Sequence, residues 1–145
     1  KGCYTGATVK TSDGRYLMVE LSEKSMNLNG IDLLGGVIET KTEMQTGENI
    51  FQSLYSELEE EGCILKKDIK ELYLRAIYLS FNTYIGFYFE VNLNVSVKEL
   101  FDRFKKNNKD TDIKSLKDFS RDEYIKILRN HKSKNKQFIE NLLNI

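Results

Sequence analysis

The first hydrophobic segments of the chain alternate with polar residues in the way that β-strands do. Residues 4–10 and 16–21 predict two strands. The residues between them include Asp13-Gly14, a dipeptide typical of a tight hairpin turn. Residues 31–34 form a short apolar segment that leads into Gly35-Gly36. A hairpin followed by a short third strand is therefore expected.

Two further strands are predicted in the middle of the chain. Residues 84–93 alternate with a period of two, which places one set of side chains in the core and the other set on the opposite face. The predicted core set is Ile85, Phe87, Phe89, Val91 and Leu93. Tyr88 and Glu90 belong to the opposite set, which faces solvent or a pocket. Residues 71–80 are largely apolar, which predicts a strand buried on both faces.

Three stretches have the signals of helices. Residues 50–61 are followed by Gly62, which suits the left-handed conformation after a helix end. A second helix, packed against the sheet, is indicated by the helical spacing of Val97, Leu100, Phe101 and Phe104. After a strand predicted over residues 112–119, Ser120 and Glu123 form a capping box that opens a helix to about residue 130.

Composition and charge exclude several classes of protein. Hydrophobic residues make up 40% of 145 residues, which fits one globular domain spanning residues 1–145. The 22 basic and 22 acidic residues balance, so no overall charge attracts nucleic acid or an anionic membrane. No apolar run approaches the length of a membrane span, so we expect no membrane association.

The cysteine count bears on the compartment. Cys3 and Cys63 are too few for a disulfide framework, and a reducing cytoplasm is the simplest expectation. No signal peptide is visible. The chain begins at Lys1 without a methionine, which leaves open whether a segment with targeting information precedes it.

The end of the first predicted helix is the most acidic part of the chain. Successive helical residues advance by about 100°, so Glu57, Glu60 and Glu61 share one face, and we expect Glu60 and Glu61 on its polar side. Three neighbouring carboxylates repel one another, and a hard divalent cation with oxygen ligands would relieve that repulsion. A run of glutamates is also typical of a solvated helix face that binds nothing. Spacing alone leaves both interpretations open.

The residues around this helix resemble the signature of the Nudix hydrolase family, G-x5-E-x7-R-E-U-x-E-E-x-G-U, in which U is aliphatic. Gly35-Gly36 stand where the family has its double glycine, and Glu39 and Gly47-Glu48 follow in the family's order. The remaining matches to the segment E-U-x-E-E are Glu57, Leu58, Glu60 and Glu61.

Three features depart from that signature. About six residues are inserted between Glu39 and Gly47, and Ser56 stands in place of the arginine. Gly62 directly follows Glu61, so the spacer before the signature glycine is interpreted as missing. The family's arginine orients the glutamates through charge-assisted hydrogen bonds, so its absence bears directly on activity.

The resemblance implies a Nudix-type α/β/α sandwich with a mixed sheet. It also implies a metal-dependent pyrophosphohydrolase, in which Mg²⁺, or Mn²⁺ in its place, assists the attack of water on a phosphorus of a nucleoside diphosphate linked to another moiety. The implied metal ligands are Glu57, Glu60 and Glu61, and the implied catalytic residues are Glu57 and Glu60. The expected substrate contacts are Gly35, Gly36 and Glu39.

The substrate itself is expected to be a nucleotide-type small molecule. Dinucleotide polyphosphates, nucleotide sugars, ADP-ribose and oxidised nucleoside triphosphates all fit, and RNA fits only as a capped substrate. The sequence indicates neither the general base nor the oligomeric state. The alternative is a Nudix-fold module that binds a nucleotide or a protein without turnover, which Ser56 and the shortened end of the signature favour. A plain interaction domain with a solvated acidic helix would require the signature matches to be accidental.

Overall fold

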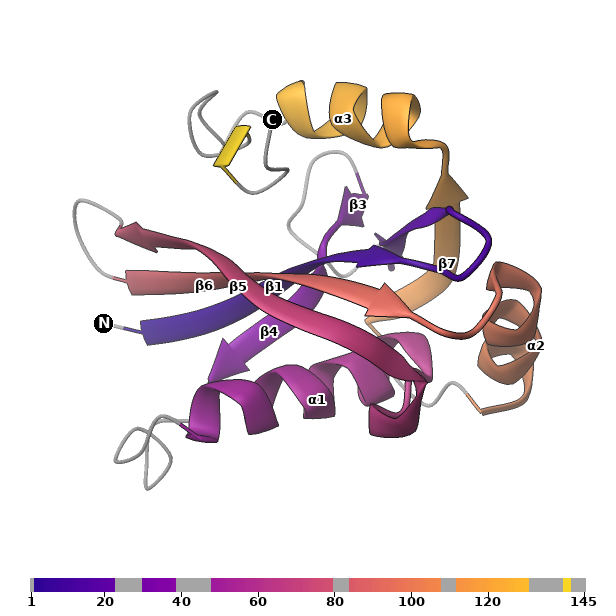
Figure 1. Cartoon of the computed structure of the whole chain (residues 1–145), viewed down its shortest axis with the longest axis horizontal. Helices are drawn as coiled ribbons and strands as arrows, with labels where there is room; N and C mark the ends of the chain where they lie inside the picture. Colours follow the sequence, from indigo (N-terminus) through magenta and orange to yellow (C-terminus); the bar gives the residue numbers. More distant parts are fainter. Residues whose placement is uncertain are drawn as a thin grey trace.

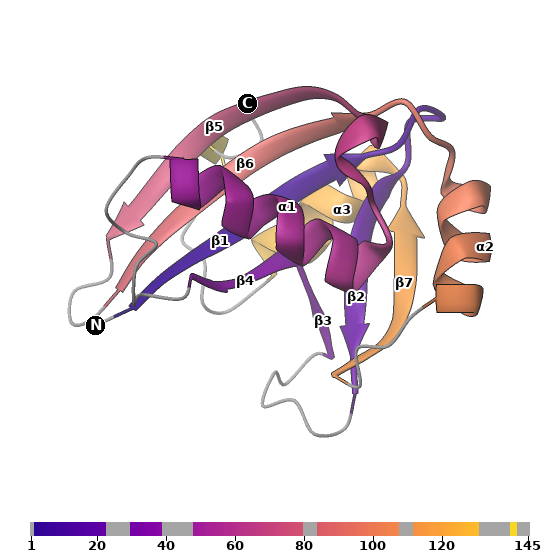
Figure 2. The same cartoon turned by 90° about the horizontal axis from the view of Figure 1, so that it is seen from below.

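The computed structural model describes residues 2–22, 30–38, 48–79, 84–107, 112–130 and 140–141. The elements in chain order are β1 (Gly2–Lys10), β2 (Tyr16–Leu21), β3 (Ile31–Asp32), β4 (Leu34–Ile38), α1 (Glu48–Gly62), the short 3-10 helix η2 (Lys66–Asp68), β5 (Ile69–Leu79), β6 (Tyr84–Leu93), α2 (Val97–Asn107), β7 (Ile113–Phe119) and α3 (Arg121–Arg129). One sheet runs through the molecule between α1 and α3, and α2 lies beside β7 at one end (Figures 1 and 2).

The described sheet has seven strands and is organised around β1. β1 runs parallel to β6 along its whole length and antiparallel to β4 along residues 3–7. β2 pairs antiparallel with β1 at Val9 and Lys10, and β3 and β7 flank β2. β5 lies beyond β6 at the other side. Parallel and antiparallel neighbours between two helix layers confirm the predicted α/β/α sandwich with a mixed sheet.

The core on the α1 side of the sheet confirms the predicted helices. Leu54 and Leu58 of α1 are fully buried and belong to one apolar cluster with Phe89 of β6 and Leu100 of α2. Their spacing of four residues puts the two leucines on one helix face. None of the described helices is both long and apolar enough to cross a membrane.

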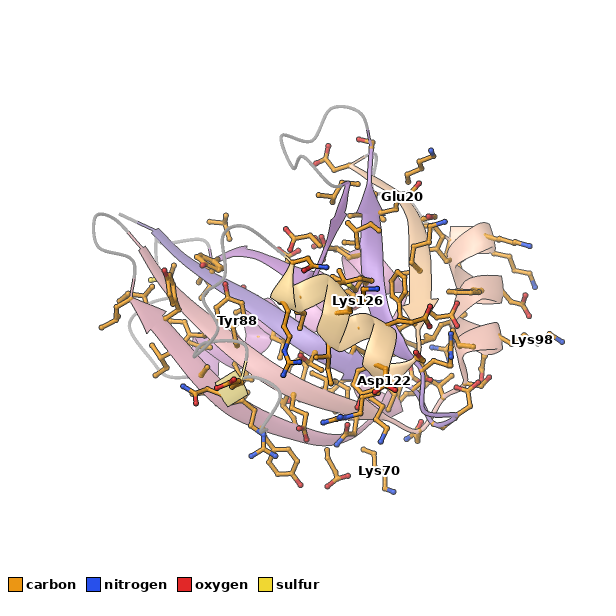
Figure 3. The ribbon with its side chains drawn as sticks, turned by 90° about the horizontal axis from the view of Figure 1, so that it is seen from above. Glu20, Lys70, Tyr88, Lys98, Asp122 and Lys126 are labelled. Atoms are coloured by element: carbon orange, nitrogen blue, oxygen red, sulfur yellow. The ribbon has the colours of Figure 1, made fainter. Side chains whose placement is uncertain are left out.

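The core on the α3 side contains a tyrosine that the alternation pattern misplaces. Tyr88 is 1% exposed and its hydroxyl donates to the Tyr4 hydroxyl at 2.8 Å. The expectation that Tyr88 faces solvent or a pocket is therefore wrong. α3 covers this face of the sheet (Figure 3), and its Tyr124 stacks on Tyr16 with ring centroids 5.0 Å apart. The alternation of apolar and polar residues separates the two faces of a strand, but it does not show whether other elements cover one face or both.

β5 is also more exposed than its composition predicts. Its residues are apolar enough for a strand buried on both faces, yet Ile77 is 56% and Leu79 71% exposed. The reason is position, because β5 is the last strand in the sheet order and α1 covers only part of it. The predicted strand is confirmed, and its predicted burial is wrong.

The double glycine lies in a strand and not in a loop. Gly35 and Gly36 belong to β4 and face Gly6 and Thr5 in the β1–β4 ladder. The short strand predicted over residues 31–34 is divided between β3 and β4. The backbone of both glycines is therefore fixed by strand pairing before any ligand binds.

A buried ion pair joins the end of α1 to α2. Arg103 of α2 donates to Asp68 at 2.6 Å and to the Cys63 carbonyl at 3.2 Å, and the Asp68 side chain is only 6% exposed. Asp68 also accepts from the backbone N–H of Leu65 at 2.8 Å. Burial by itself would raise the pKa of Asp68, but these hydrogen bonds and the guanidinium charge outweigh it and lower the pKa below its ordinary value.

Arg103→Met is expected to lower the free energy of unfolding by about 2–3 kcal/mol at neutral pH, because Asp68 keeps its charge in a buried site without a cation. The pKa of Asp68 is lower in the folded than in the unfolded chain. The stabilisation is therefore present above the unfolded value, about 3.9, and is lost as the pH falls through the folded value. Urea unfolding at neutral and at acidic pH should show the difference between the two proteins shrinking in acid. A pH-independent difference would show that packing alone is lost.

Candidate active site

Helix α1 carries its acidic end across strand β4. The buried leucines of α1 fix its rotation, so that Glu57 and Glu61 face the glycine pair of β4. We call the group of Gly35, Gly36, Glu57 and Glu61 the glycine–glutamate site. It brings together two predicted substrate contacts and two predicted metal ligands.

Glu61 is the more enclosed of the two glutamates. It is 9% exposed, and its Oε1 accepts a hydrogen bond from the Gly35 N–H at 2.7 Å. The expectation that Glu61 lies on the polar side of the helix is therefore wrong. A buried carboxylate needs hydrogen-bond donors, and the strand backbone supplies one here. The Gly35 N–H thus positions Glu61. The direct contact of Gly35 with substrate stays a prediction.

Glu57 lies directly over Gly36. A Cβ atom added to Gly36 would overlap the Glu57 carboxylate, so a side chain at this position would displace it. Gly35 has a φ of 149°, and a Cβ atom there would overlap the Thr5 carbonyl oxygen of β1. Both positions therefore require glycine because the backbone lies very close to a neighbour. Gly36 approaches the candidate catalytic residue Glu57, and Gly35 approaches strand β1.

The other predicted site residues are placed less tightly. Glu60 is exposed on α1, and Glu39 lies outside the described residues. Within the part of the chain that the structure describes, no group of three or more histidine, cysteine, aspartate or glutamate side chains is arranged to hold a metal ion. Glu61 is held at the strand by the Gly35 N–H and Glu57 lies against Gly36, whereas Glu60 is exposed.

The end of α1 shows where the signature glycine falls. The left-handed residue is Cys63, with a φ of 56°, and not Gly62, which is the last residue of the helix. The pattern E-E-x-G-U therefore begins at Glu60 and Glu61. Gly62 occupies the spacer position, Cys63 the position of the signature glycine, and the buried Ile64 the aliphatic position. The interpretation that the spacer is missing is wrong.

Gly62 is needed for a different reason. A Cβ atom at this position would lie 2.9 Å from Leu34 Cδ2, so the glycine allows α1 to pack closely on β4. The sequence points to the wrong residue because a glycine after a helix is usually the left-handed one.

Cys63→Gly is expected to stabilise the protein by about 0.5–1 kcal/mol. An L-residue pays roughly 1–2 kcal/mol for the left-handed conformation, and glycine loses part of that gain to its greater freedom in the unfolded chain. Urea unfolding of Cys63→Gly and Cys63→Ala separates conformation from side-chain loss, because alanine keeps the strain. Equal stability of the two variants would contradict the assignment.

The arginine of the family signature has no counterpart in the immediate sequence. Ser56 is exposed on α1. Two arginines that are candidates to replace it pair elsewhere: Arg15 with Asp118 at 2.8 Å and Arg75 with Glu90 at 3.4 Å.

Gly6 is a part of the site's framework that the signature residues do not indicate. Gly6 faces Gly35 in the ladder, and a Cβ atom on it would lie 2.7 Å from the Tyr88 ring. The backbone at this point is thus closely packed from the β4 side and from the α3-side core. A glycine inside an alternating strand was the available signal.

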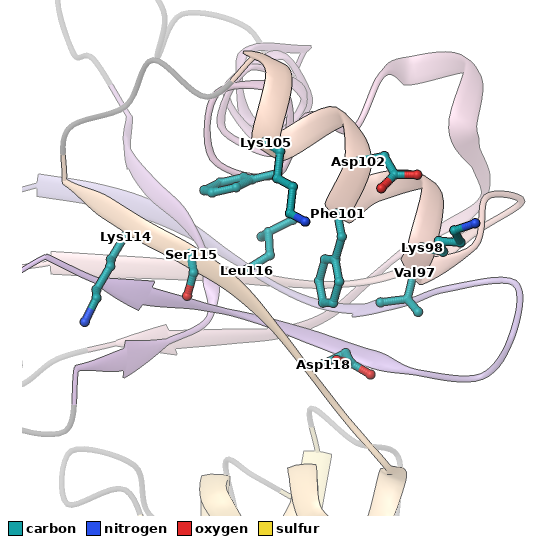
Figure 4. Close-up of a pocket in the computed structure, with 10 residues that line it drawn as sticks. Val97, Lys98, Phe101, Asp102, Lys105, Lys114, Ser115, Leu116 and Asp118 are labelled. Atoms are coloured by element: carbon teal, nitrogen blue, oxygen red, sulfur yellow. The ribbon is translucent and has the colours of Figure 1, made fainter.

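A separate hollow of about 730 Å³ lies between α2 and β7 (Figure 4). Phe101 and Leu116 form apolar parts of its wall, and Lys98, Lys105 and Lys114 also line it. No residue of α1 or β4 lines it. The hollow is therefore distinct from the glycine–glutamate site.

Comparison with known proteins relates the chain to others through its structure. No protein-family model matches it, and no curated protein matches it in sequence. A NUDIX hydrolase from Nitrosomonas europaea superposes with a TM-score of 0.63 and 20% identity, covering 99% of this chain and 86% of its own. A C. elegans Ap4A hydrolase, solved as a binary complex, gives 0.60 and 15%, covering 99% and 96%.

A third similar structure is the NUDIX domain of Shewanella oneidensis NrtR complexed with ADP ribose, with a TM-score of 0.58 and 10% identity over 86% of this chain and 75% of its own. Similarity over nearly the whole chain identifies the architecture, although the sequences have diverged. The chain has the Nudix fold, as its acidic helix and double glycine predict.

Proposed function

We propose that this protein is a metal-dependent pyrophosphohydrolase that cleaves a nucleoside diphosphate linked to another moiety. The observation that carries the proposal is the glycine–glutamate site, in which α1 holds Glu61 on the Gly35 N–H and Glu57 over Gly36. The same acidic helix follows the double glycine in the Nudix signature, and the chain has the Nudix fold. Activity, metal and substrate belong to the proposal.

The donor set fits Mg²⁺. Carboxylate oxygens are the ligands that this hard cation prefers, and it is usually held by one or two carboxylates together with substrate phosphates and water. Glu57 and Glu61 are the candidates that lie next to the glycine pair of β4, and Glu60 lies within one helical turn of both. Mn²⁺ has similar ligand preferences.

The proposed chemistry is hydrolysis of a phosphoanhydride. When bound, the cation would neutralise the phosphate oxygens and stabilise the charge that develops on them. Glu57 and Glu60 are the proposed catalytic residues, one of which accepts the proton of the attacking water. The backbone of β4 is the proposed wall for the phosphates at Gly35 and Gly36, and Glu39 is the third proposed substrate contact.

The substrate class is a nucleotide-type small molecule. Two similar structures are described as an Ap4A hydrolase complex and as a complex with ADP ribose, which supports a nucleotide ligand here. RNA belongs to the proposed substrates only in its capped form. A reducing cytoplasm is the proposed compartment, in agreement with two free cysteines.

A Nudix-fold module that binds without turnover is the second candidate. The observation in its favour is that Ser56 replaces the signature arginine and that Arg15 and Arg75 pair with other carboxylates. In such a module the acidic helix would contribute to binding, and no water would be activated.

The experiment that tests the proposal is a substrate panel with Mg²⁺, with Mn²⁺ and with EDTA. It includes a dinucleotide polyphosphate, ADP-ribose, a nucleotide sugar, an oxidised nucleoside triphosphate and capped RNA, with released phosphate or nucleoside monophosphate as the readout. We expect turnover of one class that EDTA abolishes, and a melting temperature raised by cation plus nucleotide. Turnover that is indifferent to EDTA would exclude the metal. Saturable nucleotide binding without turnover would establish the second candidate.

A further inference from the structure

The outer edge of β5 is an extended surface that the proposed function does not use. β5 is the longest described strand, with 11 residues, and within the described part of the chain it pairs only with β6. Four of its large apolar or aromatic side chains are between 40% and 71% exposed, namely Tyr73, Leu74, Ile77 and Leu79. A long edge of this composition is a template for pairing with another chain.

The strand is chemically symmetrical about Tyr73. In an antiparallel pair of two copies centred on this residue, Glu71 of one copy faces Arg75 of the other, and Leu72 faces Leu74. At the ends of the same register Ile69 faces Ile77. Opposite charges and apolar partners directly across a pair of strands are the contacts that stabilise a register.

The two faces of the strand agree with this register. On the α1 side, Leu72 and Leu74 stand opposite Val91 and Phe89 of β6, and Ile77 stands opposite Phe87. The apolar pairs of the two copies would therefore form one stripe on the α1 side, which covers side chains that are exposed in the single chain.

The polar side chains lie on the other face. The Tyr73 hydroxyl donates to Glu71 at 2.5 Å, and the Arg75 guanidinium lies 4.6 Å from the centre of the Tyr73 ring. One face of β5 therefore carries Glu71, Tyr73 and Arg75. A Glu71–Arg75 pair between two copies requires this, because side chains that face each other across two strands lie on the same side of the sheet.

Arg75 has capacity for a second carboxylate. Its ion pair with Glu90 is 3.4 Å long, whereas charge-assisted hydrogen bonds are about 2.7–2.9 Å. Its Nε is buried and has no acceptor among the described residues, but the side chain as a whole is 31% exposed, so the other N–H groups of the guanidinium are the ones a second chain can reach. A guanidinium carries five N–H donors, so Glu71 of a second copy can pair with it while Glu90 stays in place.

The charges also decide between a second copy and an unrelated peptide. Edge strands that avoid pairing use charged side chains and bulges, and β5 has two irregularities in its ladder, between Ile69 and Glu71 and between Leu74 and Ala76. Residues 71–74 form the regular stretch between them, with Tyr73 within it, and Arg75 lies at the second irregularity. In the register centred on Tyr73 the charges of Glu71 and Arg75 of two copies are complementary, which an unrelated peptide would have to match.

We propose that β5 is a homodimerisation strand, through which two copies of this chain pair antiparallel about Tyr73 and join their sheets. A single pair of strands is a small interface, so the dimer should be in reversible equilibrium with the monomer. Sedimentation from micromolar to submillimolar concentration is expected to show the mass rising from 16.9 kDa toward twice that value.

Charge reversal tests the register. Glu71→Arg and Arg75→Glu each place like charges opposite one another in both symmetrical pairs, and each alone is expected to weaken the dimer at least about tenfold. An equimolar mixture of the two variants restores both pairs and should form the mixed dimer with near wild-type affinity. Loss of a merely local contact, such as Arg75 with Glu90, would not be repaired by mixing.

Leu74→Lys provides a second variant that does not depend on the ion pairs, since Leu74 is 44% exposed and its replacement should leave the fold intact by circular dichroism. It is expected to be monomeric. Val37→Lys is the matched control, because Val37 is 68% exposed on β4, and it should dimerise like the wild type. A wild-type protein that stays monomeric throughout, a Leu74→Lys protein that still dimerises, or folded charge variants that fail to pair in the mixture would each overturn the proposal.

Discussion

Glu57→Gln and Glu60→Gln are expected to lower kcat/KM on the true substrate by at least about a hundredfold while leaving the protein folded. Each change keeps the volume and helix propensity of the side chain and removes its charge. Stabilisation of phosphate charge by a bound cation is worth several kcal/mol, and each 1.4 kcal/mol corresponds to a factor of about ten in rate. Removing one repulsive carboxylate should leave the stability in EDTA equal or slightly higher. Hydrolysis rates with Mg²⁺ and melting temperatures in EDTA measure the two effects separately.

Glu59→Gln is the matched control for this pair. Glu59 is exposed on the same helix but is not on the face shared by the three signature glutamates, so its replacement should change neither rate nor stability. Wild-type turnover by Glu57→Gln or Glu60→Gln would remove these residues from the catalytic assignment.

Glu61→Gln is expected to behave differently, because its carboxylate is buried on the Gly35 N–H. Glutamine keeps an acceptor oxygen for that hydrogen bond but loses the charge that strengthens it. A loss of about 1 kcal/mol in stability should therefore accompany the loss of activity.

Replacement by alanine should affect mainly stability at Gly35 and mainly activity at Gly36. Gly35→Ala is expected to destabilise the protein by at least about 3 kcal/mol, because the new Cβ overlaps the Thr5 backbone and the φ of 149° strains an L-residue. At Gly36 the new Cβ meets only the end of the flexible Glu57 side chain. Gly36→Ala should therefore cost less than about 1 kcal/mol of stability but a large part of the activity.

Urea unfolding and hydrolysis rates of the two alanine variants, measured side by side, check this expectation. A Gly36→Ala protein with full activity would show that the position of Glu57 over the glycine is not needed for catalysis. If Gly35→Ala were as stable as the wild type, the close approach of β4 to β1 would have to be relaxed in solution.

The order of the elements and the Nudix fold were predictable from the sequence. Residues 84–93 form a strand because their alternation leaves one apolar face, and Ser120 and Glu123 cap α3 by local hydrogen bonds of 3.2 and 2.9 Å. The double glycine and the acidic helix indicated the Nudix fold at a similarity where whole-sequence comparison finds no family. Periodicity and capping act within a few residues, so they can be recognised without knowing the rest of the chain.

Only the tertiary structure decided which of these residues are buried and what they touch. Tyr88 is enclosed because α3 covers its face, and Leu79 is exposed because β5 ends the sheet. Glu61 can be buried because the Gly35 N–H donates to it, and this partner lies 26 residues away in the chain. The left-handed conformation falls on Cys63, while Gly62 ends the helix and packs closely against Leu34. In each case the free energy depends on contacts between segments distant in sequence, and the local pattern does not contain these contacts.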